Sequence, residues 1–150
     1  MSTEPLAPIL CGVDKNEVLR AKLPELKQRC SILAMEFLAI GQMAGGPEFR
    51  TCWWAGRFAE AWGMDDYREV TRTDVKMHLL GTMRGGDPQV RAVMCHMFGG
   101  DPSKTAQKGL LNGFKSHAWQ ALAAGVTWWQ TKGKFENEAK ELYLTAEAEW

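Results

Sequence analysis

Residues 82–104, TMRGGDPQVRAVMCHMFGGDPSK, contain the motif Met-x-Gly-Gly-Asp-Pro twice, and a looser copy, MAGGP, begins at Met43. Glycine directly after a helix adopts the left-handed backbone conformation without steric cost. The Asp that follows accepts hydrogen bonds from the free amides of the next helix, and Pro is tolerated in its first turn. These short Gly-Gly-(Asp)-Pro turns are therefore predicted to end one helix and begin the next.

A phosphate-binding loop is the alternative interpretation of the glycine pairs. The P-loop requires Gly-x-x-x-x-Gly-Lys-Ser/Thr after a strand, and the dinucleotide-binding fingerprint requires Gly-x-Gly-x-x-Gly. Neither motif occurs in the chain, and no strand-like alternation precedes either pair. A helix N-terminus holds an anion only weakly without such a loop. The pairs are interpreted as breaks between helices.

Helix ends placed at these turns divide the chain into about six helices with almost no strand. The predicted fold is all-α, a single compact, bundle-like domain over residues 1–150, because no long Pro-, Gly- or Ser-rich linker divides the chain. Residues 1–13 are predicted to form an irregular N-terminal arm. A short lead-in helix is predicted to start near Asp14 and to stop at Pro24, which disfavours a helix interior. The further helices are predicted at 24–43, 47–62, 65–83, 87–98, 101–130 and 135–150, the last of them acidic.

A stripe of apolar residues runs through the first two predicted helices with steps of alternately four and three. This is the spacing of a helical bundle or a coiled coil. Two interpretations stay open: the stripe packs inside the bundle of its own chain, or it pairs with a second chain. The pattern is too short to require a partner. Its members are Leu19, Leu23, Leu26, Cys30, Leu33, Phe37, Ile40 and Ala44.

The predicted helix 47–62 is apolar on two faces. At about 100° per residue, Trp54, Phe58 and Trp62 follow one side, while Phe49 and Trp53 lie on the other with Cys52, Gly56 and Ala59. A helix of this kind is either central in its domain or presents one face to a partner. Because tryptophan is a frequent interface anchor, Trp54, Phe58 and Trp62 are predicted as a protein interface, with burial in the core as the alternative.

Composition places the chain among ordinary globular proteins, with 45% hydrophobic and 24% charged residues. No apolar run approaches the roughly 18 residues of a membrane span. The N-terminus has no basic start followed by an apolar segment, so no secretory signal is expected and a cytoplasmic location is predicted. The four cysteines are widely spaced and are expected to be reduced thiols.

No pattern of catalytic or metal-binding residues emerges. The three histidines never occur at His-x-x-x-His or Glu-x-x-His spacing, so no zinc or di-iron site is predicted. Cys95 and His96 are adjacent, and neighbours on a helix point about 100° apart, so they cannot form a nucleophile–base pair with each other. No catalytic residue, metal, cofactor or small-molecule ligand is therefore predicted.

Charge is unevenly distributed along the chain, although the net charge is zero. Residues 84–134 carry seven basic and two acidic side chains, and residues 135–150 carry five glutamates and one lysine. Basic side chains mixed with tryptophans suit a nucleic-acid backbone with stacked bases. The alternative is a solvated basic flank with its tryptophans in the core, because dedicated nucleic-acid binders are strongly basic overall. The predicted nucleic-acid-binding residues are Arg84, Arg91, Lys104, Lys108, Lys115, Trp119, Lys132 and Lys134, with Lys104, Lys108 and Lys115 on one face of the predicted helix 101–130.

These features favour a non-catalytic helical interaction or accessory protein. Its expected partner is another protein or a second copy of the chain. The chain is expected to act within a nucleoprotein complex or as a phage- or plasmid-type inhibitor of its partner. One alternative is direct RNA- or DNA-backbone binding through residues 84–134. The other is an enzyme whose helical active site carries no recognisable motif.

Overall fold

The computed structural model describes residues 6–37, 45–104, 109–133 and 136. This part of the chain is mostly helical but contains a small parallel sheet, so the all-α prediction is wrong in part. It has five α-helices, so the count of about six predicted for the whole chain is not confirmed. The elements are α1 (Asn16–Arg29), β1 (Leu33–Phe37), α2 (Gly46–Trp62), β2 (Tyr67–Thr71), α3 (Arg72–Leu80), α4 (Asp87–Met97) and α5 (Ala118–Trp128), with a 3-10 turn at Met64–Asp66 and a π-helical turn at Trp129–Gly133.

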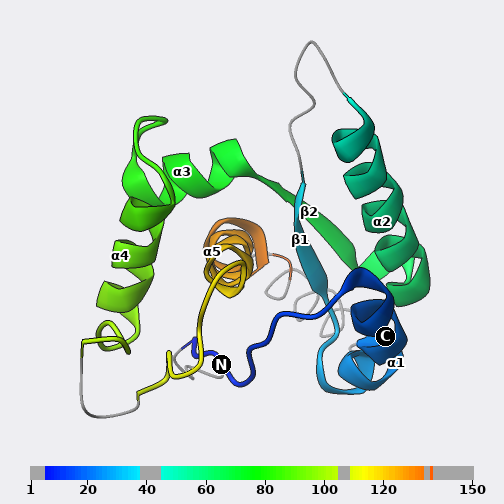
Figure 1. The fold of residues 1–150 in the computed structure, drawn as a ribbon, viewed down its shortest axis with the longest axis horizontal. Helices are drawn as coiled ribbons and strands as arrows, with labels where there is room; N and C mark the ends of the chain where they lie inside the picture. Colours follow the sequence, from blue (N-terminus) through cyan, green and yellow to red (C-terminus); the bar gives the residue numbers. More distant parts are fainter. Residues whose placement is uncertain (1–5, 38–44, 105–108, 134–135, 137–150) are drawn as a thin grey trace, which may run out of the picture.

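The two strands and the helix between them form a β-α-β unit. β1 and β2 pair in parallel, with Leu33 opposite Tyr67 at one end and Phe37 opposite Thr71 at the other. Parallel strands need a long crossover connection, and α2 supplies it. Figure 1 shows α2 on one side of the strands and α5 on the other, with α4 beyond α5.

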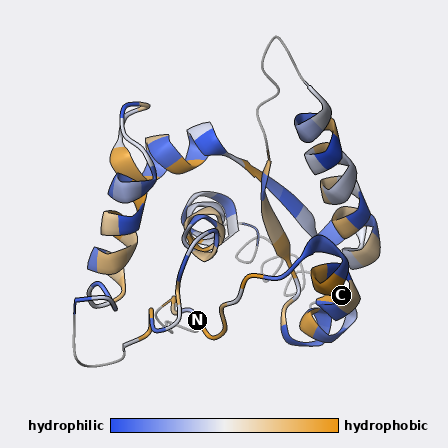
Figure 2. Cartoon of the chain, in the orientation of Figure 1, coloured by the Kyte–Doolittle hydropathy of each residue, from blue (hydrophilic) through white to orange (hydrophobic). Residues whose placement is uncertain are grey.

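β1 replaces the middle of the predicted helix 24–43. Its side chains alternate between two buried clusters: Leu33 and Met35 pack on the α1–α2 side, and Ala34 packs on the α5 side. A strand that is covered on both faces has a nearly continuous run of apolar residues. In β1 the apolar residues Leu33 and Phe37 are four positions apart, which is also the spacing of a helix face, so the sequence pattern predicted a helix here. Figure 2 shows the contrast between the largely hydrophobic β1 and the more hydrophilic β2.

β2 replaces the start of the predicted helix 65–83, and α3 begins directly after it. Thr71 is the last residue of the strand and also the N-cap of the helix. The Asp74 amide donates to Thr71 Oγ1 at 3.1 Å, and the Thr71 amide donates to Asp74 Oδ2 at 2.9 Å. This reciprocal capping box starts a helix at a defined residue.

The glycine pairs stand at helix ends, as predicted. Gly45 and Gly86 are the N-caps of α2 and α4, and the Gly86 amide donates to Gln89 Oε1 at 2.8 Å. Gly99 follows α4 with φ +99°, a backbone conformation that glycine adopts far more readily than other residues. No phosphate-binding geometry is needed to explain these glycines.

Two further predicted boundaries differ from the structure. α1 continues through Pro24 to Arg29 instead of breaking there. The predicted helix 101–130 is reduced to α5, because Asp101 starts a turn: its Oδ1 accepts from the Ser103 amide at 2.9 Å. Residues 6–15 contain no helix or strand, in keeping with the predicted arm. The predicted acidic helix 135–150 lies outside the described residues except for Glu136, whose carboxylate pairs with Arg68 at 3.0 Å.

Candidate interaction surface

The predicted interface residues form a core cluster instead of an exposed face. Trp54, Phe58 and Trp62 are only 7%, 6% and 3% exposed. They pack against Leu23 and the neighbouring leucines of α1, so the first part of the leucine stripe covers this face of α2 within the chain itself. The prediction that these three side chains contact a partner is therefore corrected: their partner is α1.

The opposite face of α2 is exposed. Phe49 and Trp53, one helical turn apart, are 64% and 53% exposed. Arg57 lies one turn further on, and its guanidinium carbon is 4.6 Å from the ring centroids of both Trp53 and Trp54. This double cation–π contact holds a flexible cationic side chain against the exposed indole. Phe49, Arg50, Trp53 and Arg57 are called the outer face of α2 below.

The unpaired charges of the outer face are positive. Arg50 and Arg57 make no ion pair with any described residue. The two glutamates of α2 are engaged: Glu48 Oε2 accepts from the Gly45 amide at 3.0 Å, and Glu60 lies 4.0 Å from Arg20. The outer face therefore combines exposed aromatic rings with two available guanidinium groups.

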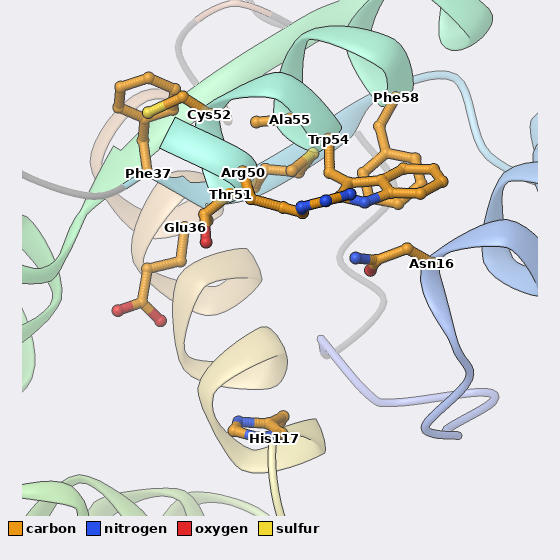
Figure 3. A pocket seen from close by; sticks show the side chains of 11 residues that line it. Asn16, Glu36, Phe37, Arg50, Thr51, Cys52, Trp54, Ala55, Phe58 and His117 are labelled. Carbon is orange, nitrogen blue, oxygen red and sulfur yellow. The ribbon is translucent and has the colours of Figure 1, made fainter. Parts of the chain in front are cut away.

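A cleft of about 470 Å³ adjoins this face at Arg50. It lies between the start of α1, the end of β1, the first half of α2 and the residue before α5. Figure 3 shows Arg50, Asn16 and His117 around the same space, from α2, from α1 and from the start of α5. The cleft is also lined by Met35, Glu36, Phe37, Thr51, Cys52, Ala55 and Phe58.

The polar groups of the cleft are partly engaged within the chain. Glu36 is paired with Arg72 at 3.5 Å, so its charge is partly compensated. Cys52 and His117 both line the cleft, but no hydrogen bond joins them in the described structure. Within the described residues, no three His, Cys, Asp or Glu side chains are close enough to hold a metal ion.

The predicted nucleic-acid site is not assembled as expected. Trp119 is 4% exposed and lies in the core, so its ring cannot stack on a base. Arg91 is held over that ring at 4.7 Å and pairs with Asp101 at 3.0 Å. Hydrogen bonds from Ser103, followed by Arg91, lower the pKa of Asp101 to about 2. Trp119 is therefore a core residue, and Arg91, whose side chain is 39% exposed, is engaged in contacts within the chain.

The remaining described members of the predicted set are exposed but separated. Arg84 and Lys104 flank α4, and Lys115 and Lys132 flank α5. Each helix has 11 residues and so spans about 16 Å at 1.5 Å per residue. The basic stripe expected on one long helix is absent here because residues 101–117 are not helical where they are described. Lys108 and Lys134 lie outside the described residues.

The cysteines and the membrane prediction add two observations. The four cysteines form no disulfide, and Cys95 is buried in the core. In the described ranges, every helix is too short or too polar to cross a bilayer.

Comparisons of the chain with protein-family models, curated proteins and solved structures give no match.

Proposed function

We propose that this chain is a non-catalytic interaction protein that binds an acidic surface of another protein through the outer face of α2. The observation that carries the proposal is the exposure of Phe49 and Trp53 beside the aligned guanidinium of Arg57. Tryptophan and arginine are the residue types most enriched among those that dominate binding energy. A monomer rarely leaves neighbouring large aromatic side chains in water without a use.

The size of α2 fits a protein partner. Its 17 residues span about 25 Å at 1.5 Å per residue, which is enough to present one side of a standard interface of roughly 800 Å². Aromatic side chains each bury on the order of 150–250 Å². Phe49 and Trp53 together would thus supply a large share of the apolar part of such an interface.

The positive charge of the outer face favours one kind of protein partner over another. In a symmetric dimer the same surface patch meets itself, so the positively charged outer faces of the two copies would meet each other. Like charges brought together across an interface are unfavourable. We therefore favour a different protein, one that offers a carboxylate for each arginine and an apolar pocket for the aromatic rings. An accessory subunit of a nucleoprotein complex and a phage- or plasmid-type inhibitor are the classes of function that fit this mode of binding.

A residue-specific cross-linking experiment tests the proposal. A photoreactive amino acid replaces Trp53 in one variant and Met97, which is 38% exposed on α4, in the control. We expect one acidic protein from the host to be captured at position 53 and not at position 97. Its purified form should bind Trp53→Ala at least about 30-fold more weakly than the native chain, the effect of losing a 2 kcal/mol anchor. Equal capture at both positions, or unchanged affinity, would refute the proposal.

Direct RNA or DNA binding is the second proposal. It is favoured by one observation: Arg84, Lys104, Lys115 and Lys132 make no ion pair with other described residues. With Trp119 in the core, such binding would use phosphate contacts alone and would not discriminate between sequences.

A further inference from the structure

The cleft beside Arg50 has the size of a small-molecule site. Its volume of about 470 Å³ is within the range of such sites. Side chains of α1, β1, α2 and the residue before α5 line it. Apart from Arg50, none of its described lining residues belongs to the outer face of α2. A ligand in this cleft would therefore be recognised mainly by groups that the proposed protein partner does not contact.

Three polar side chains of the cleft are exposed and have no partner among the described residues. They are Arg50 of α2, Asn16 at the start of α1 and His117 before α5. None of them makes a side-chain hydrogen bond or an ion pair within the described part of the chain. Figure 3 shows the three around the same space. Because these side chains are exposed, a ligand can reach them without any rearrangement of the core.

The charge around the cleft favours an anion. Arg50 carries an unpaired positive charge, whereas the negative charge of Glu36 is partly compensated by Arg72 at 3.5 Å. α1 and α5 also begin at the cleft, so the positive ends of two helix macrodipoles lie beside it. A guanidinium binds a carboxylate through two parallel hydrogen bonds. One unpaired arginine balances the single charge of a carboxylate better than the roughly two charges of a phosphate group.

The rest of the cleft is largely apolar. Met35 and Phe37 of β1 are half-buried and line it together with Trp54, Ala55 and Phe58 of α2. Trp54 and Phe58 are already covered by the α1–α2 cluster, so Met35 and Phe37 supply most of the apolar surface that a ligand can contact. An accessible cation beside an apolar surface suits an anion with an apolar body better than a bare inorganic anion.

We propose that this cleft binds a small monocarboxylate with an apolar body, such as a medium-chain fatty acid or an aryl-substituted carboxylic acid. The carboxylate accepts hydrogen bonds from the Arg50 guanidinium, and the apolar body lies along Met35 and Phe37. Asn16 and His117 bound the site at α1 and α5. Arg50 also belongs to the outer face of α2, so this ligand and the protein partner compete for its guanidinium.

Methyl NMR of the full chain tests the proposal. The methionine methyl groups are isotopically labelled, because Met35 lines the cleft whereas Met64, which is 66% exposed, does not. The probes are hexanoate and 3-phenylpropionate, compared with their uncharged amides and with acetate, which lacks the apolar body. We expect at least one of the two acids to shift the Met35 signal saturably and to leave the Met64 signal in place. The matching amide and acetate should bind at least about tenfold more weakly.

Two results of this titration would overturn the proposal. One is the absence of a saturable Met35 shift at millimolar concentrations of both acids. The other is binding of the amide or of acetate as tight as that of the acid, because the site would then not recognise the carboxylate and the apolar body together.

Two variants test the role of Arg50. Arg50→Gln removes the charge and keeps most of the side-chain length, and we expect the native Tm because this exposed arginine has no ion pair with a described residue. The acid should bind this variant at least about tenfold more weakly. The control, Arg29→Gln, removes an exposed arginine of α1 that does not line the cleft and should keep the native affinity. Native affinity in Arg50→Gln, or an equal loss in Arg29→Gln, would contradict the proposal.

Discussion

The two adjacent tryptophans of α2 make a sharp test of the fold, because the same substitution should lower the Tm by very different amounts at the two positions. Trp54 is 7% exposed and contacts Phe58 at 5.6 Å between ring centroids, whereas Trp53 is 53% exposed. Trp54→Ala removes a large buried side chain, which typically costs about 3–5 kcal/mol. For a chain of 150 residues this lowers the Tm by about 6–20 °C, at roughly 2–4 °C per kcal/mol.

Trp53→Ala has a smaller expected effect on stability. Its ring makes one of the two cation–π contacts of Arg57, worth about 0.5–1 kcal/mol at an exposed site. The contact with Trp54 remains, so we expect the Tm to fall by about 1–4 °C. Circular-dichroism melting of both variants measures the difference. Equal shifts, or a larger shift for Trp53→Ala, would refute the assignment of the core and outer faces of α2.

Three further predictions concern the glycine turns, the α3 cap and the basic residues. Gly99→Ala should destabilise the chain by about 1–2 kcal/mol in urea unfolding because φ is +99°, whereas Gly56→Ala, inside α2 with open space around it, should leave stability unchanged or raise it; equal effects would contradict the role of Gly99 as a helix break. Thr71 hydrogen bonds lower the pKa of Asp74 below 3.8, so the cap stabilises the fold above that pH and weakens as Asp74 is protonated below it; the stability difference between the native chain and Thr71→Ala, about 1 kcal/mol at neutral pH, should therefore shrink in acid unfolding measurements, and a constant difference would be inconsistent with this coupling. If the chain binds RNA or DNA, fluorescence anisotropy should show affinity falling steeply with salt, with a flatter slope in Lys104→Ala/Lys115→Ala/Lys132→Ala; absence of binding at low salt would eliminate that function.

Helices with explicit start and stop residues could be predicted closely from the sequence. α2 and α4 were each predicted to within one residue at both ends, because Gly-Gly-Pro and Gly-Gly-Asp-Pro mark their starts and glycine or an aromatic residue follows their ends. Such caps act locally, so their effect does not depend on the rest of the fold.

The strands could not be predicted in the same way. β1 is covered on both faces, so it lacks the alternation that distinguishes a half-exposed strand from a helix. β1 is a strand because it pairs with β2, and each residue of β1 lies opposite the residue 34 positions later in the chain. The Thr71–Asp74 pair was a usable signal, because a Thr-x-x-Asp capping box after Val70 predicts a helix start at Arg72.

The sites were harder to predict than the helices. The helical spacing separates Trp53 from Trp54, but which face α1 covers depends on tertiary packing. The leucines Leu19, Leu23 and Leu26 were the available signal, since a stripe of that length must cover an apolar neighbour.

Oxidative footprinting of α2, with and without the cross-linked partner, tests the role of its outer face most directly. In the free chain, Phe49 and Trp53 should react with hydroxyl radicals while Trp54 and Trp62 stay protected. In the complex, we expect protection to appear at Phe49 and Trp53 and to leave the exposed Met97 of α4 reactive. A complex in which Trp53 keeps its full reactivity would show that this helix face does not bind the partner.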